Sequence, residues 1–235
     1  MEKHETIVAL DVPSAREAAA AVARIGDAVS FYKVGLELFL ADGPETLRAL
    51  RGEGKRVFLD LKLHDIPRTV ERAVGSCLRY APDLLTIHAQ GSTAMVEAAA
   101  RAVREAGSDA KILAVTLLTS LDGSDLEKLG VSRTVEEEVL ALGRLAAAAG
   151  AHGLVCSPRE AAALRAALGP DAILVTPGVR PAGGERGDQK RVATPADAIR
   201  AGATHVVVGR PVLGAPDPRA AALAIRDEIR AAAGA

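Results

Sequence analysis

The residues Phe58–Pro67 read FLDLKLHDIP and place three charged side chains, Asp60, Lys62 and Asp65, in a run that is otherwise mostly apolar. Side chains of a β-strand alternate between two faces, so Asp60 and Lys62 share a face with Phe58, and the leucines between them share the other. If helices cover the leucine face, the charged face points into whatever the sheet encloses, where unpaired charge is costly. The stretch therefore predicts a strand whose charged end serves binding or catalysis, with a solvated surface strand as the alternative.

Short β-rich runs alternate with Ala- and Leu-rich amphipathic runs along the chain, a pattern typical of βα units and a parallel sheet. Strands are expected at Thr6–Val12, Phe31–Leu36, Val57–Leu63, Leu84–Ala89, Ile112–Leu118, Gly153–Ser157, Ile173–Pro177 and His205–Gly209. Helices are expected near Ala15–Arg24, Pro44–Arg51, Arg68–Tyr80, Thr93–Ala106, Val135–Ala149, Arg159–Leu168, Pro195–Ala201 and Pro218–Ala233. This order predicts a single (β/α)8 barrel domain of the TIM type over residues 1–235. A doubly wound open sheet is the alternative, but the turn Asp11–Ser14 after the first strand has no glycine.

Composition narrows the class of partner. The chain has 29 basic and 30 acidic side chains in 235 residues, without a run of Lys and Arg, and only 2% of its residues are aromatic. The composition therefore argues against a nucleic-acid partner, since nucleic-acid binding uses a basic track and aromatic rings for base stacking. The sequence contains no Walker A motif, no H-E-x-x-H and no Cys/His cluster with metal spacing, so a nucleoside triphosphate and a zinc site gain no support.

The N-terminal residues run into the first strand without an apolar signal region, and no apolar run of 18 or more residues follows. The two cysteines, Cys77 and Cys156, have no C-x-x-C partner, which favours reduced thiols. We therefore expect a cytoplasmic protein that does not bind membranes.

Polar residues at the carboxyl ends of the strands form the active site in barrels of this type. The first four expected strands carry ionisable groups there, opposite an apolar face: Asp11, Lys33, Asp60 with Lys62, and His88. The fifth runs into Thr119 and Ser120. We expect the charges to meet at one mouth and to neutralise one another in part. A packing role and a functional role are equally compatible with His88.

A second polar signal follows the seventh and eighth strands. The segment Thr176–Pro181 opens a glycine-rich loop over residues 179–194, and Val208–Pro211 reads VGRP. Glycine lets backbone N–H groups approach a phosphate, and arginine offers a fork of donors. A phosphate site is therefore predicted, with the loop as its lid; its residues are Gly209, Arg210, Arg180 and Gln189.

Taken together, these motifs resemble the bacterial type of orotidine 5′-phosphate decarboxylase. The residues that carry the resemblance are Asp11, FYKVG around Lys33, FLDLKLHDIP at 58–67, TPGVRP at 176–181, DQKR at 188–191 and VGRP at 208–211. D-x-K-x-x-D alone indicates only the wider group of phosphate-binding barrels, and Ile66-Pro67 with Thr69 and the two late motifs narrow it. One departure is Gly187, where the family often has an aspartate.

The resemblance implies conversion of orotidine 5′-phosphate to UMP and carbon dioxide, the last step of pyrimidine synthesis, without a metal or an organic cofactor. It implies that Lys62 donates a proton to C6, with Asp60 and Asp65 beside the substrate carboxylate. Lys33 and Asp11 would hold this array and the ribose. The other implied substrate contacts are Thr119 and Ser120 at the pyrimidine, and Pro177, Arg180, Gln189, Gly209 and Arg210. A homodimer is also implied, in which Asp65, Ile66 and Thr69 reach the neighbouring site.

Two other functions remain open from the sequence. A sugar-phosphate decarboxylase or aldolase-type synthase on the same scaffold would need a divalent metal, with Glu37 and Asp60 as conceivable ligands. A nucleotide-phosphate sensor without chemistry would keep the phosphate site, but it would gain nothing from buried carboxylates that face an anionic ligand.

Overall fold

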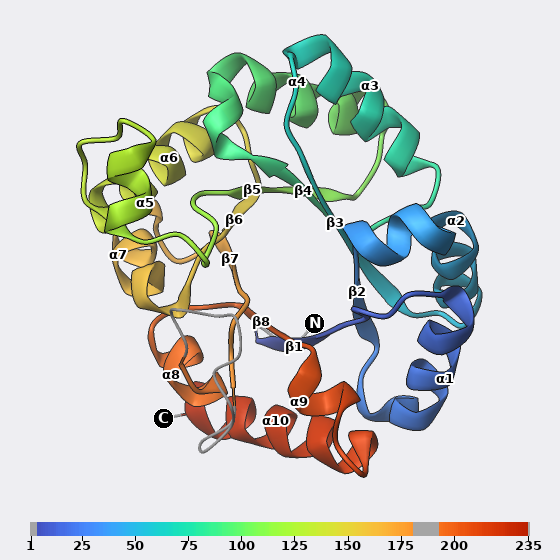
Figure 1. Cartoon of the computed structure of the whole chain (residues 1–235). Coiled ribbons are helices and arrows are strands. Elements are labelled where there is room, and N and C mark those ends of the chain that lie inside the picture. Colours follow the sequence, from blue (N-terminus) through green and yellow to red (C-terminus); the bar gives the residue numbers. More distant parts are fainter. Residues whose placement is uncertain (1–3, 181–192, 235) are drawn as a thin grey trace.

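Eight parallel strands form a closed barrel, in chain order, with helices around the outside (Figure 1). The computed structural model describes residues 4–180 and 193–234. The strands are β1 (Glu5–Ala9), β2 (Phe31–Gly35), β3 (Arg56–Leu63), β4 (Leu84–His88), β5 (Lys111–Val115), β6 (Gly153–Val155), β7 (Ile173–Thr176) and β8 (His205–Val208). The barrel closes because β8 pairs with β1, from Glu5 opposite His205 to Val8 opposite Val208. The predicted (β/α)8 barrel is confirmed.

Each expected helix is present outside the strands. These helices are α1 (Ala15–Ile25), α2 (Leu36–Gly52), α3 (Pro67–Leu78), α4 (Ser92–Glu105), α6 (Val135–Ala148), α7 (Pro158–Leu168), α8 (Pro195–Arg200) and α10 (Pro218–Ala233). Among the described residues, two short α-helices were not expected, α5 (Gly123–Lys128) and α9 (Arg210–Leu213). The first is nucleated by a capping box, in which the Asp122 carboxylate accepts the N–H groups of Ser124 and Asp125.

The expected start of the second helix at Pro44 is wrong, because α2 already begins at Leu36. Asp42 interrupts it with non-helical backbone angles (φ −141°, ψ 30°), and its carboxylate accepts the N–H of Ala15 at 2.9 Å. Proline is tolerated just after such a break because the N–H that it lacks would have no helical acceptor there. Strand ends also differ from expectation, and β1 and β5 stop three residues early, at Ala9 and Val115.

The strands bury both of their faces. The inner face fills the barrel with one apolar cluster, Ile7, Ala9, Phe31, Phe58, Leu84, Leu113, Val115, Val155, Val175 and Val207. The outer face packs under the helices and includes Val8, Leu10, Tyr32, Val34, Val57, Leu59, Leu85, Ile87, Ile112 and Ala114. The predicted alternation of inner and outer side chains is therefore confirmed in β1 to β4. In β5, Leu113 and Val115 face the barrel interior, and Ile112 and Ala114 face the helices. Inner residues farther along each strand must then point to the mouth of the barrel.

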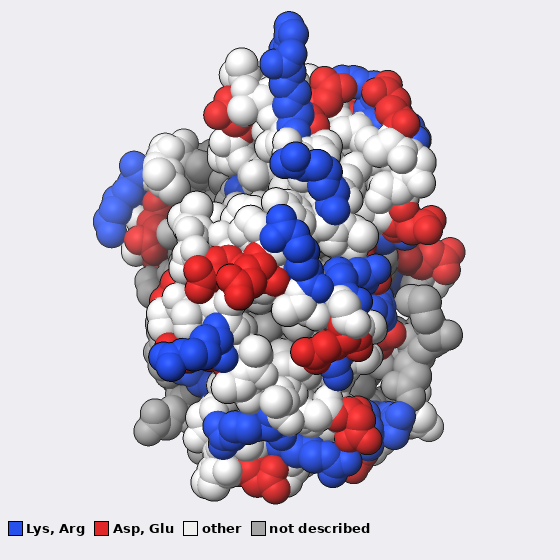
Figure 2. All heavy atoms as spheres, turned by 90° about the vertical axis from the view of Figure 1, so that its right-hand side faces the viewer, with Lys and Arg blue, Asp and Glu red and all other residues white. Residues whose placement is uncertain are grey.

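The helical face that carries α2 mixes basic and acidic side chains, with several Lys and Arg in its upper half (Figure 2). Such mixing differs from the single-sign track that follows a phosphate backbone. Both cysteines are free thiols in buried positions. Among the described residues, no helix combines the length and the apolar character that a membrane span requires.

Candidate active site

A chain of four charged side chains lies at the carboxyl ends of β1, β2 and β3. Lys33 Nζ is 2.9 Å from Asp11 Oδ1 and 3.7 Å from Asp60 Oδ2. Lys62 Nζ is 2.8 Å from the same Asp60 oxygen. Lys33 and Asp60 each follow a barrel-core phenylalanine by two positions, so strand alternation carries them to the inner face just beyond the apolar layer. The charges alternate in sign from Asp11 through Lys33 and Asp60 to Lys62.

Of the four charged side chains, Asp60 has the most buried one, with only 11% of its area exposed. Burial raises the pKa of its carboxyl, but the charges of Lys62 and Lys33 and hydrogen bonds from Lys62 and Thr86 outweigh burial and bring the pKa below its usual value. Asp60 is therefore ionised at neutral pH and shared between two ammonium groups. Such sharing holds both lysines at defined positions inside the mouth.

Lys62 reaches the mouth through an irregular stretch of β3. The pairing of β3 with β4 shifts between Leu59 opposite Leu85 and Leu63 opposite Ile87. Within that stretch Lys62 has a φ of 50°, in the left-handed region that non-glycine residues rarely adopt. Such strain costs about 1–3 kcal/mol and is typical of functional sites. The backbone N–H of Lys62 donates to the Thr86 hydroxyl at 2.9 Å.

A cavity of about 230 Å³ opens beside the charged chain. Its lining comes from strand ends around the barrel and comprises Ala9, Asp11, Lys33, Phe58, Asp60, Lys62, Thr119, Val155, Pro177, Gly178, Arg180, Val207, Gly209 and Arg210. Carboxylates and ammonium groups line it together with the arginines that follow β7 and β8. A ligand with a reactive polar group at one end and an anionic group at the other fits such a lining.

Two glycines shape the arginine-bearing part of the lining. Gly178 has a φ of 76°, which favours glycine over any other residue. A Cβ at Gly209 would lie 3.5 Å from Asp11 Oδ2, an ordinary van der Waals contact. The backbone at Gly209 borders the cavity close to Asp11, with no side chain between them.

Several predicted site residues lie elsewhere. Asp65, Ile66 and Thr69 are exposed and do not line the cavity. Ser120 is also exposed and outside the lining, whereas its neighbour Thr119 belongs to it. Gln189, and residues 181–192 of the predicted lid, fall outside the described residues.

Two residues near the charges were not singled out from the sequence as site residues. Thr86, on the inner face of β4, donates its hydroxyl proton to Asp60 Oδ1 at 2.9 Å. A Cβ at Gly35 would lie 2.9 Å from Lys33 Nζ, so the absence of a side chain there makes room for that ammonium. Strand alternation places Thr86 on the same face as His88, but no sequence pattern shows that its hydroxyl reaches β3.

His88 lies near the rim of this site without lining the cavity. Its ring centroid is 5.3 Å from that of His64, and its Nδ1 is buried without a hydrogen-bond partner among the described residues. Burial lowers the pKa of His88, and the nearby His64 and Lys62 lower it further. The imidazole is therefore neutral at neutral pH and adds no charge to the Asp–Lys chain.

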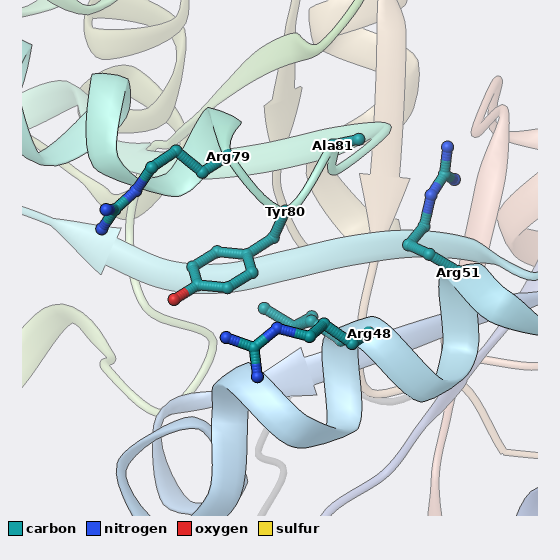
Figure 3. A pocket seen from close by; sticks show the side chains of 6 residues that line it. Arg48, Arg51, Arg79, Tyr80 and Ala81 are labelled. Atoms are coloured by element: carbon teal, nitrogen blue, oxygen red, sulfur yellow. The ribbon is translucent and has the colours of Figure 1, made fainter.

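A second hollow, of about 400 Å³, lies between the ends of α2 and α3 (Figure 3). The Arg48 guanidinium lies 6.0 Å from the centre of the Tyr80 ring, and Arg51 pairs with Asp83 at 3.0 Å. Tyr80 and Ala81 precede β4, so this hollow is at the amino end of the barrel. This hollow is larger than the cavity at the mouth of the barrel, but none of the four charged side chains Asp11, Lys33, Asp60 and Lys62 lines it.

The alternative sugar-phosphate function would require a metal site. In residues 4–180 and 193–234, which the structure describes, no three His, Cys, Asp or Glu side chains are grouped so that they could hold an ion. Glu37, the conceivable partner of Asp60, is exposed on α2 and does not line the cavity.

Comparisons with known proteins show which family the chain belongs to. The family model described as orotidine 5′-phosphate decarboxylase / HUMPS family matches residues 5–225. The chain is 55% identical over 217 residues to an orotidine 5′-phosphate decarboxylase of Anaeromyxobacter sp., covering 92% of this chain and 94% of the relative. It is 54% identical over 233 residues to one of Rhodopseudomonas palustris, covering 99% and 97%. The crystal structure of the Lactobacillus acidophilus orotidine 5′-phosphate decarboxylase superposes with a TM-score of 0.86 at 36% identity, covering 96% of this chain and 99% of that one.

Proposed function

Because the chain belongs to the orotidine 5′-phosphate decarboxylase / HUMPS family, we propose that it converts orotidine 5′-phosphate to UMP and carbon dioxide without a metal or an organic cofactor. The family resemblance in the sequence is confirmed, and this reaction belongs to pyrimidine biosynthesis. The observation that carries the proposal is the Asp11–Lys33–Asp60–Lys62 chain in one cavity with Arg180 and Arg210. One cavity then serves the reacting ring and the phosphate of a single nucleotide.

The proposed chemistry centres on Lys62. Cleavage of the bond between C6 and the carboxylate releases carbon dioxide and leaves the electron pair at C6, in the ring plane, where no conjugated system absorbs it. The Lys62 ammonium stabilises that pair electrostatically and then donates a proton to it, which forms the C6–H bond of UMP. The neutral amine afterwards regains a proton from water. Asp60, next to the substrate carboxylate, favours its departure, and Lys33 and Asp11 orient the array and the ribose.

The remaining contacts bind parts of the substrate that do not react. We assign the phosphate to Arg180, Arg210, Gln189 and the backbone at Gly209, next to Pro177, and the pyrimidine to Thr119 and Ser120. Binding energy from a remote phosphate can hold the reacting ring in place and close a lid over it. We propose that role for the loop over residues 179–194.

We further propose a homodimer with shared sites. Large apolar side chains are exposed on α2 and before α3: Leu36 at 49%, Leu40 at 79% and Ile66 at 68%. A second copy that covered them would also receive Asp65, Ile66 and Thr69, which the cavity of their own chain does not use.

Shared sites predict complementation between two inactive variants. Each shared site would take Lys62 from one protomer and Asp65 from its partner. A heterodimer of Lys62→Ala with Asp65→Ala therefore has one site with both substitutions and one site with neither, and a reassembled mixture should contain such heterodimers. Random assortment then restores roughly a quarter of the wild-type activity. Decarboxylation and sedimentation velocity are measured on the same mixtures. No recovery in mixtures that contain heterodimers would rule out the shared site.

The proposed reaction is tested by the fall in ultraviolet absorbance when the purified protein meets orotidine 5′-phosphate in buffer with a chelator. Rapid loss, with UMP as the product, is expected. A folded protein that leaves the absorbance unchanged would contradict the proposal. Sugar phosphates with magnesium, and then ligand binding without turnover, would be examined next.

Gly35→Ala is predicted to impair catalysis without unfolding the protein. The new Cβ would stand 2.9 Å from Lys33 Nζ, and the end of a lysine side chain moves away easily. The ammonium would then leave Asp11 and Asp60, and kcat/KM should fall by about 10–100-fold with an almost unchanged Tm. Gly75→Ala is the matched control, since nothing lies within 4 Å of its Cβ; it should keep full activity. Normal kcat/KM in Gly35→Ala would contradict a role for the Lys33 position.

A further inference from the structure

Thr86 lies where β3 loses its regular pairing with β4. Its side chain is fully buried, and its hydroxyl oxygen is 2.9 Å from Asp60 Oδ1 and 2.9 Å from the backbone nitrogen of Lys62. A threonine hydroxyl can donate one proton and accept others. It therefore donates to the carboxylate and accepts the Lys62 N–H at the same time. One atom of β4 thus contacts both members of the Asp60–Lys62 pair.

The hydroxyl compensates for a lost ladder bond. Between the pairs Leu59–Leu85 and Leu63–Ile87, four residue steps of β3 face two steps of β4. Regular hydrogen bonding cannot continue through such an excess, and a buried N–H without an acceptor is unfavourable. The Lys62 N–H finds its acceptor in the Thr86 side chain, while the Lys62 backbone has a φ of 50°. The hydroxyl therefore helps to hold a backbone conformation that a lysine would otherwise leave.

We propose that Thr86 is a positioning residue for the reaction. It fixes the orientation of the Asp60 carboxylate and the backbone of Lys62, and thereby the place from which the Lys62 ammonium serves the substrate. Thr86 does not line the cavity, so it acts through these two residues and not through the substrate. This inference rests on the function proposed for Asp60 and Lys62.

Thr86→Val keeps the branched shape of the side chain and removes the hydroxyl. The Lys62 N–H and one Asp60 oxygen would then be buried without their partner, the carboxylate could rotate, and the strained backbone could relax. The phosphate contacts after β7 and β8 do not involve Thr86. We therefore expect the loss in kcat and not in KM.

The test compares Thr86→Val and Thr86→Ser with Thr6→Val. Thr6 is also buried in a strand, but its hydroxyl has no partner among the described residues, so it controls for the exchange itself. Thr86→Val should lower kcat by about 10²-fold with KM within a few-fold of wild type, because small displacements of catalytic groups are costly. Thr86→Ser should recover most of that loss, and Thr6→Val should behave as wild type.

A readout without turnover separates positioning from general damage. Because the hydrogen bond from Thr86 adds to the two lysine charges that keep the Asp60 pKa low, the ¹³C NMR titration of the Asp60 carboxyl should move to higher pH in Thr86→Val. It should stay in place in Thr86→Ser and in Thr6→Val. If the valine variant does not fold, Thr86→Ser and Thr86→Ala lack the same methyl group and differ only in the hydroxyl, so they carry the same comparison.

Two results would overturn the inference: a kcat of Thr86→Val within twofold of wild type, or a serine variant as impaired as the variant without a hydroxyl. A wild-type protein that does not decarboxylate orotidine 5′-phosphate would instead refute the proposed function. In that event the titration of Asp60 still decides whether the hydroxyl orients the carboxylate.

Discussion

Lys62→Met is expected to lower kcat/KM for orotidine 5′-phosphate by at least about 10⁴-fold. Proton donation by a positioned group contributes roughly 10²–10⁴-fold, and a preorganised charge at the developing anion contributes about 10²–10³-fold more. In the proposed mechanism Lys62 supplies both effects, and methionine removes both while it preserves much of the length of the lysine side chain. Binding of UMP should persist, because the arginines that follow β7 and β8 remain.

Stopped-flow and long-time absorbance assays measure the loss, and titration with UMP measures what remains of binding. Lys111→Met is the control: this lysine is exposed at the start of β5, far along the strand from the mouth, and should be replaceable without effect. If Lys62→Met kept more than a tenth of the wild-type kcat/KM, Lys62 would not be the proton donor.

Asp60→Asn is expected to reduce kcat/KM by about 10³-fold and to destabilise the fold by about 1–3 kcal/mol. Its carboxylate accepts from Lys62, lies 3.7 Å from Lys33 Nζ and accepts from Thr86. An amide loses the negative charge that both ammonium groups share, and removing one partner of an enclosed ion pair is costly. The stability loss is smaller than for a fully buried pair, because Lys62 is 30% exposed and Lys33 keeps Asp11.

The pH dependence of unfolding provides a second readout for Asp60. Its pKa is lowered in the folded protein, so its contribution to stability is complete above the pKa of an unfolded aspartate, about 3.9, and is lost as the pH falls through the folded value. Asn has no such contribution to lose. The difference in unfolding free energy between the wild type and Asp60→Asn should therefore shrink in acid.

The two substitutions should not be additive. In the proposed mechanism Asp60 acts on the substrate partly through Lys62, so Asp60→Asn should cost much less kcat/KM in a Lys62→Met background than in the wild type. A full double-mutant cycle measures the difference. Equal losses in both backgrounds would mean that Asp60 and Lys62 act independently, against the paired arrangement seen at 2.8 Å.

Most of the fold was predictable because it depends on local periodicity. The alternation in β1 to β4 assigns Val8, Tyr32, Leu59 and Leu85 to the helix-covered face, where the structure has them. Helix boundaries were less accessible. The sequence after β2, from Leu36 to Ala41, has no change of apolar pattern that would mark where the strand ends and the helix begins. The break in α2 at Asp42 depends on a hydrogen bond from the N–H of Ala15. That contact joins two βα units and so has no signature in either one alone.

The sequence by itself determined that a (β/α)8 barrel forms and that Asp11, Lys33, Asp60 and Lys62 face its mouth, because strand alternation and the order of βα units are local properties. Only the tertiary structure decided how they meet there. The distances between them, the room left at Gly35 for Lys33, and the hydroxyl of Thr86 between Asp60 and Lys62 depend on how neighbouring strands are aligned. That register, with the irregular stretch that gives Lys62 a φ of 50°, is set when eight strands close on one another, and no segment encodes it alone.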